Sequence, residues 1–433
     1  MIYFTDPKYT NNIDIIIRDP HMKPSAAVIC LLLWFCLSPP GYSQSGEASL
    51  NIFGYFQSSF QHWTTLTSSS NRPDIIVGET RKAQNAFSMQ QLNLFLSKDL
   101  SRHWRAFVNF EALNNFSSQR RWGGFNLEEA WVRYKPSDYF NLKLGLLIPE
   151  FNHLNEIKNR TPLLPYIIRP LIYETSFYEF VGAIEQATPA RAFLQAGGTL
   201  LLPEAKMDYA LYLGNSPNIA TWEDGQQSGV DTTTNLLVGG RLGLRDRSWK
   251  AGISLTYDRI NIGIRQVGVA VYDFIFRDSD RIRLGGDLLF NAGRVFFEGE
   301  GVKVMYDEVS EIRIDGAPPA QAPDGDIGVD GHFFYGTLGY HLGERSQLYG
   351  GYWYIKGDFI VVASQTPRLY TTIGSEYFTV HTAGFAHQLN ERITVKGQYS
   401  RLNLRDRIPL LISYPAVIKG HVDHFALAVS VFF

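Results

Sequence analysis

Cysteine is nearly absent from this sequence of 433 residues, and its two copies, Cys30 and Cys36, both precede residue 44. The rest of the chain can therefore form neither a disulfide nor a thiolate metal site. The net charge of −2 lacks the basic excess that is typical of nucleic-acid binding, so we expect no nucleic-acid partner. After residue 43 no apolar run reaches the length of about 20 residues that a membrane-spanning helix needs.

Familiar enzyme motifs are also missing. The sequence contains no His-Glu-x-x-His, no Gly-x-Ser-x-Gly, no phosphate-binding loop and no dinucleotide-binding fingerprint. We therefore expect neither an enzyme nor a bound cofactor.

The first 43 residues differ in character from the rest. A positive charge at Lys23 precedes an apolar stretch over 26–37, which prolines and a glycine end. This is the pattern of a secretory signal peptide, which we expect to be cleaved after Ser43. An uncleaved anchor is the alternative, although the apolar stretch is too short to span a membrane as a helix. The expected division is a mis-assigned upstream extension at 1–21, a signal peptide at 22–43 and a folded domain at 44–433.

Apolar and polar residues alternate along most of the chain after residue 48. At the C-terminal end, Phe425, Leu427 and Val429 alternate with smaller or polar residues, and 249–257 repeats the pattern. A period of two indicates β-strands with one apolar face. Little helical or continuous core sequence is present to cover so many half-apolar strands. The alternation therefore favours a barrel whose apolar face meets lipid and whose polar face meets a lumen.

The links between the expected strands support the membrane barrel. We expect sixteen strands, at 49–60, 87–97, 104–113, 126–135, 140–148, 193–202, 206–214, 234–244, 248–257, 281–290, 295–305, 332–342, 346–355, 377–388, 392–401 and 422–433. Short links alternate with long ones, and the long ones are 61–86, 114–125, 149–192, 215–233, 258–280, 306–331, 356–376 and 402–421. Short periplasmic turns, long external loops and an even strand count are typical of outer-membrane barrels. The prediction is an all-β protein, a 16-stranded antiparallel transmembrane β-barrel in the outer membrane of a Gram-negative-type bacterium.

Three stretches resemble bacterial outer-membrane porins. The ending 425–433, with alternate apolar residues up to Phe433, resembles the terminal strand that the barrel-assembly machinery reads in those families. The stretches 128–136 and 142–149 are similar to the fourth and fifth strands of phosphate-selective porins, and 209–215 is similar to their seventh. This resemblance implies a homotrimeric channel for passive diffusion of small hydrophilic solutes, including phosphate-like anions. It also implies that the third external loop, 149–192, folds into the lumen; a position outside on the rim is the alternative.

Charged side chains on the polar face are the candidates for lining a pore, because rings of charge set pore selectivity. The basic candidates are Arg105, Arg133, Lys135, Lys143, Arg160, Arg169, Arg241, Arg245, Lys250, Arg281, Arg283 and Lys396. The acidic candidates are Glu111, Glu129, Asp287, Glu298 and Glu300. The wall is slightly more basic than acidic, so a mild preference for anions is the hypothesis. The alternative is that these charges pair with one another.

Two other functions stay open. A closed barrel would serve as an adhesin or surface anchor if large inward side chains fill the lumen; the candidates are Phe53, Tyr55, Phe107, Trp131, Tyr212, Tyr335 and Trp353. An outer-membrane hydrolase would need a Ser–His pair on neighbouring strands, for which His381 and Ser400 are the candidates.

Two metal sites are weaker hypotheses. The spacing of Asp324, Asp326 and Asp330 is similar to part of a calcium-binding loop, but no glutamate stands at its twelfth position. His421 and His424 are close enough in sequence to be considered as metal ligands. A solvated loop is the simpler explanation of the aspartates, and we expect no bound metal.

Overall fold

The computed structural model describes residues 49–68, 80–113, 124–173, 188–189, 191–216, 233, 235–267, 271–306, 311–314, 320–321, 330–365, 368–408 and 416–433. The expected signal peptide and the upstream extension lie outside these residues, as do Asp324 and Asp326 of the calcium hypothesis.

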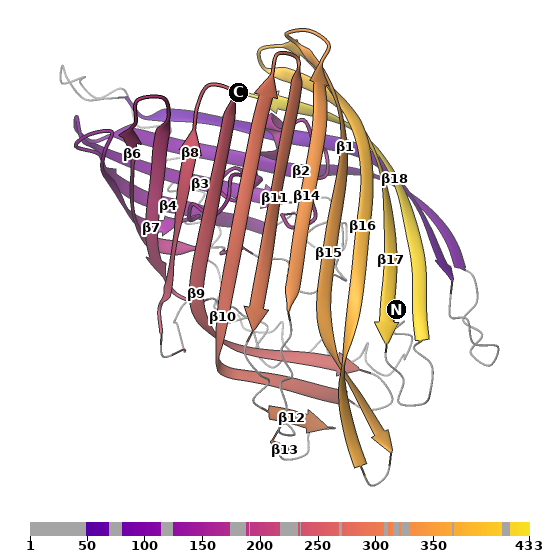
Figure 1. The fold of residues 1–433 in the computed structure, drawn as a ribbon. Coiled ribbons are helices and arrows are strands. Elements are labelled where there is room, and N and C mark those ends of the chain that lie inside the picture. Colours follow the sequence, from indigo (N-terminus) through magenta and orange to yellow (C-terminus); the bar gives the residue numbers. More distant parts are fainter. Residues whose placement is uncertain are drawn as a thin grey trace, which may run out of the picture.

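Sixteen antiparallel strands form a closed barrel, which confirms the predicted fold class (Figure 1). The strands of its first half are β1 (Asn51–Ser68), β2 (Thr80–Asp99), β3 (Trp104–Leu113), β4 (Gly124–Tyr134), β5 (Asn141–Leu147), β6 (Ala192–Leu201), β7 (Lys206–Gly214) and β8 (Leu237–Arg245). Those of the second half are β9 (Trp249–Val267), β10 (Val271–Ala292), β11 (Val295–Tyr306), β14 (Gly331–His341), β15 (Ser346–Gln365), β16 (Arg368–Asn390), β17 (Ile393–Ile408) and β18 (Ala416–Phe432). Two further short strands, β12 (Glu311–Ile314) and β13 (Ala320–Gln321), extend the sheet beside β10. The ring closes where β1 pairs with both β2 and β18.

The two faces of the wall differ in polarity. On β8, Val238, Leu242 and Leu244 are 40–48% exposed on the outer face, whereas Arg241 between them is buried on the inner face. A closed barrel leaves no strand edge unpaired, and an exterior of large apolar side chains is stable only in lipid. The barrel is therefore that of an outer-membrane protein. The described residues contain no helix that is long and apolar enough to cross a membrane.

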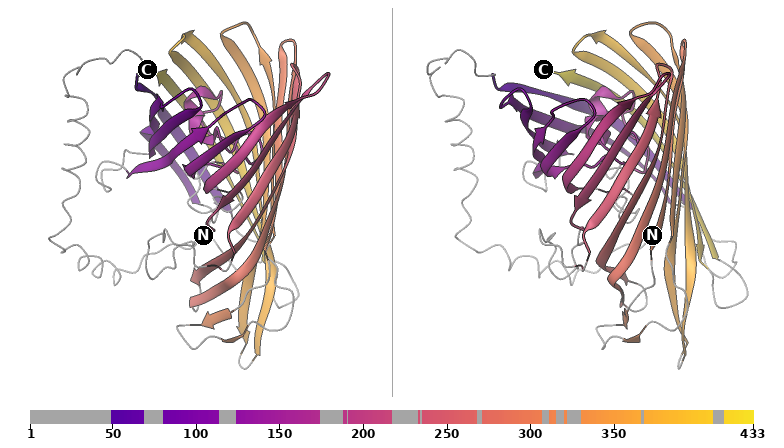
Figure 2. Two further views of the ribbon diagram at one scale, coloured as in Figure 1. Left: turned by 90° about the vertical axis from the view of Figure 1, so that its left-hand side faces the viewer. Right: turned by 60° about the vertical axis from the view of Figure 1, so that its left-hand side comes forward.

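The wall is uneven in height. The strands from β5 to β8 contain between seven and ten residues, whereas β9, β10, β15 and β16 contain between 19 and 23. Figures 1 and 2 show the β15–β16 hairpin reaching beyond its neighbours. Most of 258–280 and 356–376, which we predicted to be loops, is therefore strand. The backbone ladder continues past the apolar band, because strand pairing needs no apolar face.

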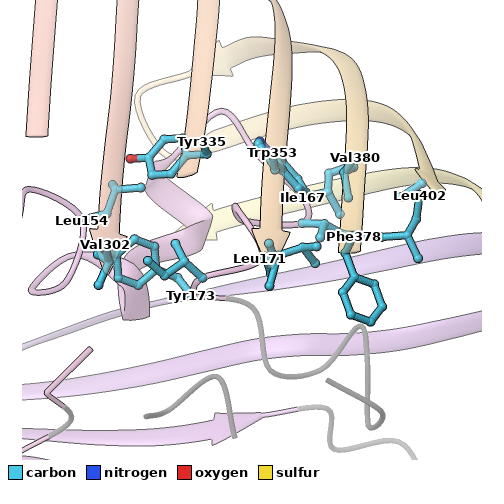
Figure 3. Packing of buried hydrophobic residues seen from close by; sticks show 14 of the residues in the cluster. Leu154, Ile167, Leu171, Tyr173, Val302, Tyr335, Trp353, Phe378, Val380 and Leu402 are labelled. Atoms are coloured by element: carbon cyan, nitrogen blue, oxygen red, sulfur yellow. The ribbon is translucent and has the colours of Figure 1, made fainter. Parts of the chain in front are cut away.

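A segment between β5 and β6 lies inside the barrel, as the resemblance implied. The segment includes the 3₁₀ helix η2 (Lys158–Leu163). Ile167 and Leu171, which follow this helix in the segment, are fully buried. Figure 3 shows these two residues packed against Trp353 and Val380 of the wall. The inner face of β11 and β14–β18 is apolar where this segment contacts it. We call residues 148–173 the inner loop.

The large aromatic side chains that we considered for a packed lumen do face inward. Tyr212, Tyr335 and Trp353 are at most 2% exposed, and the last two belong to the cluster beneath the inner loop. The inner loop therefore covers the part of the wall formed by β11 and β14–β18.

Candidate pore vestibule

The inner loop turns into the barrel directly after β5, which ends at Leu147. Asn152 has a φ of 53°, a left-handed conformation that asparagine tolerates better than most residues. Its backbone N–H donates to Oγ of Ser254 on β9 over 2.9 Å. A Cβ atom at Gly285 would collide with the Asn152 side chain, so the glycine makes room for this turn.

Two glutamates of β11 hold the inner loop in place. Glu300 accepts hydrogen bonds from the Leu154 backbone N–H at 2.6 Å and from the Tyr173 hydroxyl at 2.5 Å. Glu298 accepts hydrogen bonds from the hydroxyls of Tyr166 and Tyr335, each at 3.2 Å. Both glutamates were predicted to line the pore; the structure places them at the contact between wall and loop.

Lys396 on β17 anchors the middle of the inner loop. Its Nζ donates to the carbonyl oxygens of Thr161 and Pro162, each at 3.0 Å, and to that of Tyr166 at 3.3 Å. It also donates to Oε1 of Gln57 at 2.9 Å, and the residue is fully buried. Lys396 therefore lies beneath the loop, and not on an open surface as predicted.

A cavity of about 730 Å³ remains beside the inner loop, at the end of the barrel that carries the short turns. Six basic and four acidic side chains line it: Arg133, Lys135, Lys206, Arg241, Arg245 and Lys250, with Asp138, Glu150, Glu156 and Asp208. We call this cavity the vestibule. Five of the basic residues were predicted from the alternation of the strands.

Ion pairs fix most charges around the vestibule. Arg241 contacts both carboxylate oxygens of Asp287, with Nη2 2.7 Å from Oδ2. Arg245 Nε lies 2.6 Å from Asp208 Oδ2. Lys143 on β5 lies 3.4 Å from Glu156 of the inner loop. These pairs cancel part of the basic charge that the sequence suggested.

Two loop residues of the vestibule have shifted pKa values. The pKa of Glu150 is raised to about 7, because burial and the nearby charge of Glu156 raise it more than Lys143 lowers it. The pKa of His153 is lowered to about 3, by burial above all and also by the nearby charges of Lys250 and Arg241. A neutral His153 can then accept a hydrogen bond from Lys250 Nζ, which lies 3.1 Å from its Nδ1.

A second charged cluster is buried in the wall. Asp258 accepts hydrogen bonds from Arg281 Nε at 2.8 Å and Nη2 at 2.5 Å, and from Arg283 Nη1 at 3.3 Å. All three side chains are at most 1% exposed. The two arginines, predicted to line a pore, are thus packed around one aspartate.

The remaining predicted residues occupy the inner face or the inner loop. Arg105 pairs with Asp99 at 2.5 Å, and Lys135 pairs with Asp138 at 2.7 Å in the following turn. The Glu129 side chain accepts from Trp131 Nε1, and Glu111 from Gln91 Nε2. Arg160 is exposed, whereas Arg169 is buried.

Sequence reasoning missed some vestibule residues. His153 lies on the inner loop, where no period marks the direction of a side chain, and it was not singled out. Lys206 at the start of β7 was also missed, although it has the same parity as Asp208, which lines the vestibule too. Gln195 on β6 does not line the vestibule but holds one of its residues, and it was missed as well: its Nε2 donates to Glu150 over 2.8 Å.

The structure contradicts two side-chain pairings. His381 is exposed on the outer face, whereas Ser400 is buried on the inner face and bonded to Thr382, so they form no Ser–His pair. His421 and His424 are three residues apart on β18 and therefore point to opposite faces. Among the described residues no group of three possible metal ligands is present.

Comparison with known proteins identifies the fold. No family model matches the chain, and no curated protein matches it in sequence. Among solved structures, an anion-selective porin from Comamonas acidovorans is similar with a TM-score of 0.53 and 14% identity, over 89% of this chain and 100% of that one. The outer membrane channel DcaP of Acinetobacter baumannii is similar with a TM-score of 0.52 and 10% identity, over 91% of this chain and 99% of that one. The chain therefore has the fold of outer-membrane porins.

Proposed function

We propose that this protein is a porin, a passive diffusion channel for small hydrophilic solutes with a mild preference for anions. The observation that carries the proposal is the vestibule: a water-accessible, charged cavity inside a closed barrel, where six basic side chains face four acidic ones. Charge rings of this kind select ions by sign.

The proposed pore is the space that the inner loop leaves free. The loop is fixed by Glu298, Glu300 and Lys396 against β11 and β14–β18, which leaves the side of β4–β9 for solutes. The surroundings of Arg241, Lys250 and Arg133 would then be the narrow charged passage. Phosphate-like anions are one solute class that fits this charge.

A homotrimer and recognition by the barrel-assembly machinery belong to the same proposal. Phe433 exchanges two backbone hydrogen bonds with Gly54, at 2.9 and 3.0 Å, so the terminal residue takes part in closing the barrel. A residue in that position is well placed for a factor that reads the last strand before closure.

Planar-bilayer recording of the purified protein tests the proposal. We expect stepwise openings, grouped in threes if the protein is a trimer, and a reversal potential in a salt gradient that indicates a modest preference for chloride over potassium. A cation-selective reversal potential would refute the anion preference while leaving the channel intact.

One observation favours a second function, a closed barrel that serves as a surface anchor. The inner loop buries an extended apolar cluster inside the lumen, which is more than a simple constriction requires. Folded, heat-modifiable protein that gives no conductance at all would support this function against the porin.

A further inference from the structure

Four aromatic rings form a row across the inner face of β1 to β4. Phe53 stacks on Phe95 with ring centroids 5.0 Å apart, and Phe95 lies 5.7 Å from Phe107. Phe107 in turn stacks on Trp131, with centroids 4.8 Å apart and an angle of 24° between the planes. We call these four residues the ring row. The inner face of a water-filled barrel is usually polar, so a row of rings there, of which Phe53, Phe107 and Trp131 are partly exposed, needs an explanation.

Three cations lie next to the ring row, two residues further toward the short turns. Arg105 is paired in register with Arg133, and Arg133 with Lys143, so the three stand side by side on β3, β4 and β5. We call them the cation row. Two residues along a strand correspond to about 7 Å. Lys143 Nζ also lies 5.7 Å from the centre of the Trp131 ring, which joins the two rows.

The middle cation differs from its neighbours. Arg105 is paired with Asp99, and Lys143 with Glu150 and Glu156. Arg133 has no ion pair within the described part of the chain, and its buried Nε has no hydrogen-bond partner there. Arg133 also lines both the vestibule and a neighbouring cavity of about 660 Å³ at the turn end. An anion in either cavity would give the guanidinium of Arg133 the counter-ion that it lacks among the described residues.

We propose that the ring row and Arg133 together form a binding site for small aromatic carboxylates. The carboxylate binds the Arg133 guanidinium, and the ring of the solute packs against Phe107 and Trp131. The proposed site names a class of solute for the proposed porin, and its role in transport rests on that porin function.

The geometry favours an aromatic acid over other anions. Inorganic phosphate or acetate would use Arg133 but gain nothing from the rings. A neutral sugar would contact the rings but leave Arg133 without a partner. An aromatic acid places a flat apolar ring and a carboxylate a few ångströms apart, on the scale of the spacing between the two rows.

Ligand-observed NMR titration of the purified, folded barrel tests binding without requiring conductance. The probes are benzoate, cyclohexanecarboxylate, which keeps the charge but loses the aromatic ring, and benzyl alcohol, which keeps the ring but loses the charge. Contact of the solute ring with the edges of Phe107 and Trp131 predicts that benzoate binds about threefold to tenfold more tightly than cyclohexanecarboxylate. Benzyl alcohol should bind more weakly than benzoate, because Arg133 then loses its anionic partner.

Variants assign the two halves of the site. Arg133→Gln should weaken benzoate binding about tenfold, because a hydrogen-bonded charge partner is lost. Phe107→Leu should reduce benzoate binding to the level of cyclohexanecarboxylate, whereas Trp131→Phe, which keeps a ring, should retain most of the preference. Lys206→Gln is the matched control: it removes one positive charge from the same vestibule, away from the rings, and should weaken both acids equally.

The outcomes separate this inference from the proposed function. Benzoate binding that depends on Arg133 and Phe107 supports the site even if the barrel proves closed in a bilayer. Equal binding of benzoate and cyclohexanecarboxylate, or binding that Arg133→Gln leaves unchanged in a folded variant, overturns it even if the barrel conducts.

Discussion

Replacing Asp258 by asparagine should destabilise the barrel strongly. Asp258 is the shared partner of Arg281 and Arg283, and none of the three side chains is more than 1% exposed. The substitution keeps the size of the side chain but removes the negative charge that the buried guanidinium groups of Arg281 and Arg283 share. Breaking a buried pair in this way costs about 3–5 kcal/mol.

Removing one arginine should be less harmful than removing the aspartate. Arg283→Met leaves Asp258 with Arg281, whose two hydrogen bonds at 2.8 and 2.5 Å are shorter than the 3.3 Å contact of Arg283. The remaining pair is then balanced in charge. We therefore expect the loss of stability to be clearly smaller than for Asp258→Asn.

Urea unfolding in lipid vesicles measures both variants, followed by tryptophan fluorescence and by mobility on unheated gels. Asp99→Asn is the control, because Asp99 and its partner Arg105 are 44% and 43% exposed and water can replace the lost contact. The reasoning is refuted if Asp258→Asn shifts the unfolding midpoint no more than Asp99→Asn does. That result would mean that lumen water solvates the cluster.

Three further predictions concern the lumen and its closure. Lowering the pH from 8 to 6 should raise the anion-to-cation permeability ratio. The pKa of Glu150 is about 7, so this side chain passes from roughly nine-tenths ionised to roughly one-tenth ionised and the vestibule becomes more positive. Glu150→Gln should abolish this change, and a permeability ratio that falls on acidification would contradict the assignment to Glu150. Lys396→Met removes a charged donor from three loop carbonyls, and each lost hydrogen bond costs at most about 1.5–3 kcal/mol. The inner loop should then be held less firmly, which gives larger and noisier single-channel currents. Currents identical to those of the unchanged protein would show that the loop stays docked without Lys396. Phe433→Ala should reduce the amount of folded barrel in cells several-fold while refolding in detergent is nearly unchanged, and equal loss in both settings would point to stability and not to recognition.

The fold could be predicted from the sequence because one rule governs most of it. Lipid on one side and water on the other impose a period of two, and strands such as β3 and β7 begin and end where the alternation predicted. The rule fails outside the apolar band. Beyond Tyr257, β9 continues for ten residues that we predicted as loop. Its pairing with β10 continues there, and Arg259 forms ion pairs with Asp278 and Asp280 across the two strands.

The candidate site was less predictable, because parity gives the face of a residue but not its neighbours. Arg241 and Lys250 were correctly expected on the inner face, and both line the vestibule. The alternation also places Lys396 and Glu300 on the inner face, but the inner loop covers them. Which inward charges meet water depends on where the loop docks, and that contact joins residues more than 140 positions apart.

The apolar patch beneath the inner loop also sets an order for assembly. The loop follows β5, but the surface on which it docks belongs to β11 and β14–β18, the last strands to be made. Until those strands are in place, Ile167 and Leu171 lack the wall side chains that they pack against in the finished barrel. Docking of the loop must therefore come late in folding. It then covers the apolar inner face of β11 and β14–β18, which would otherwise be exposed to water in the lumen. A barrel whose C-terminal strands stay unpaired would expose this apolar patch to the periplasm. Chaperones and proteases there would then recognise an incompletely folded protein.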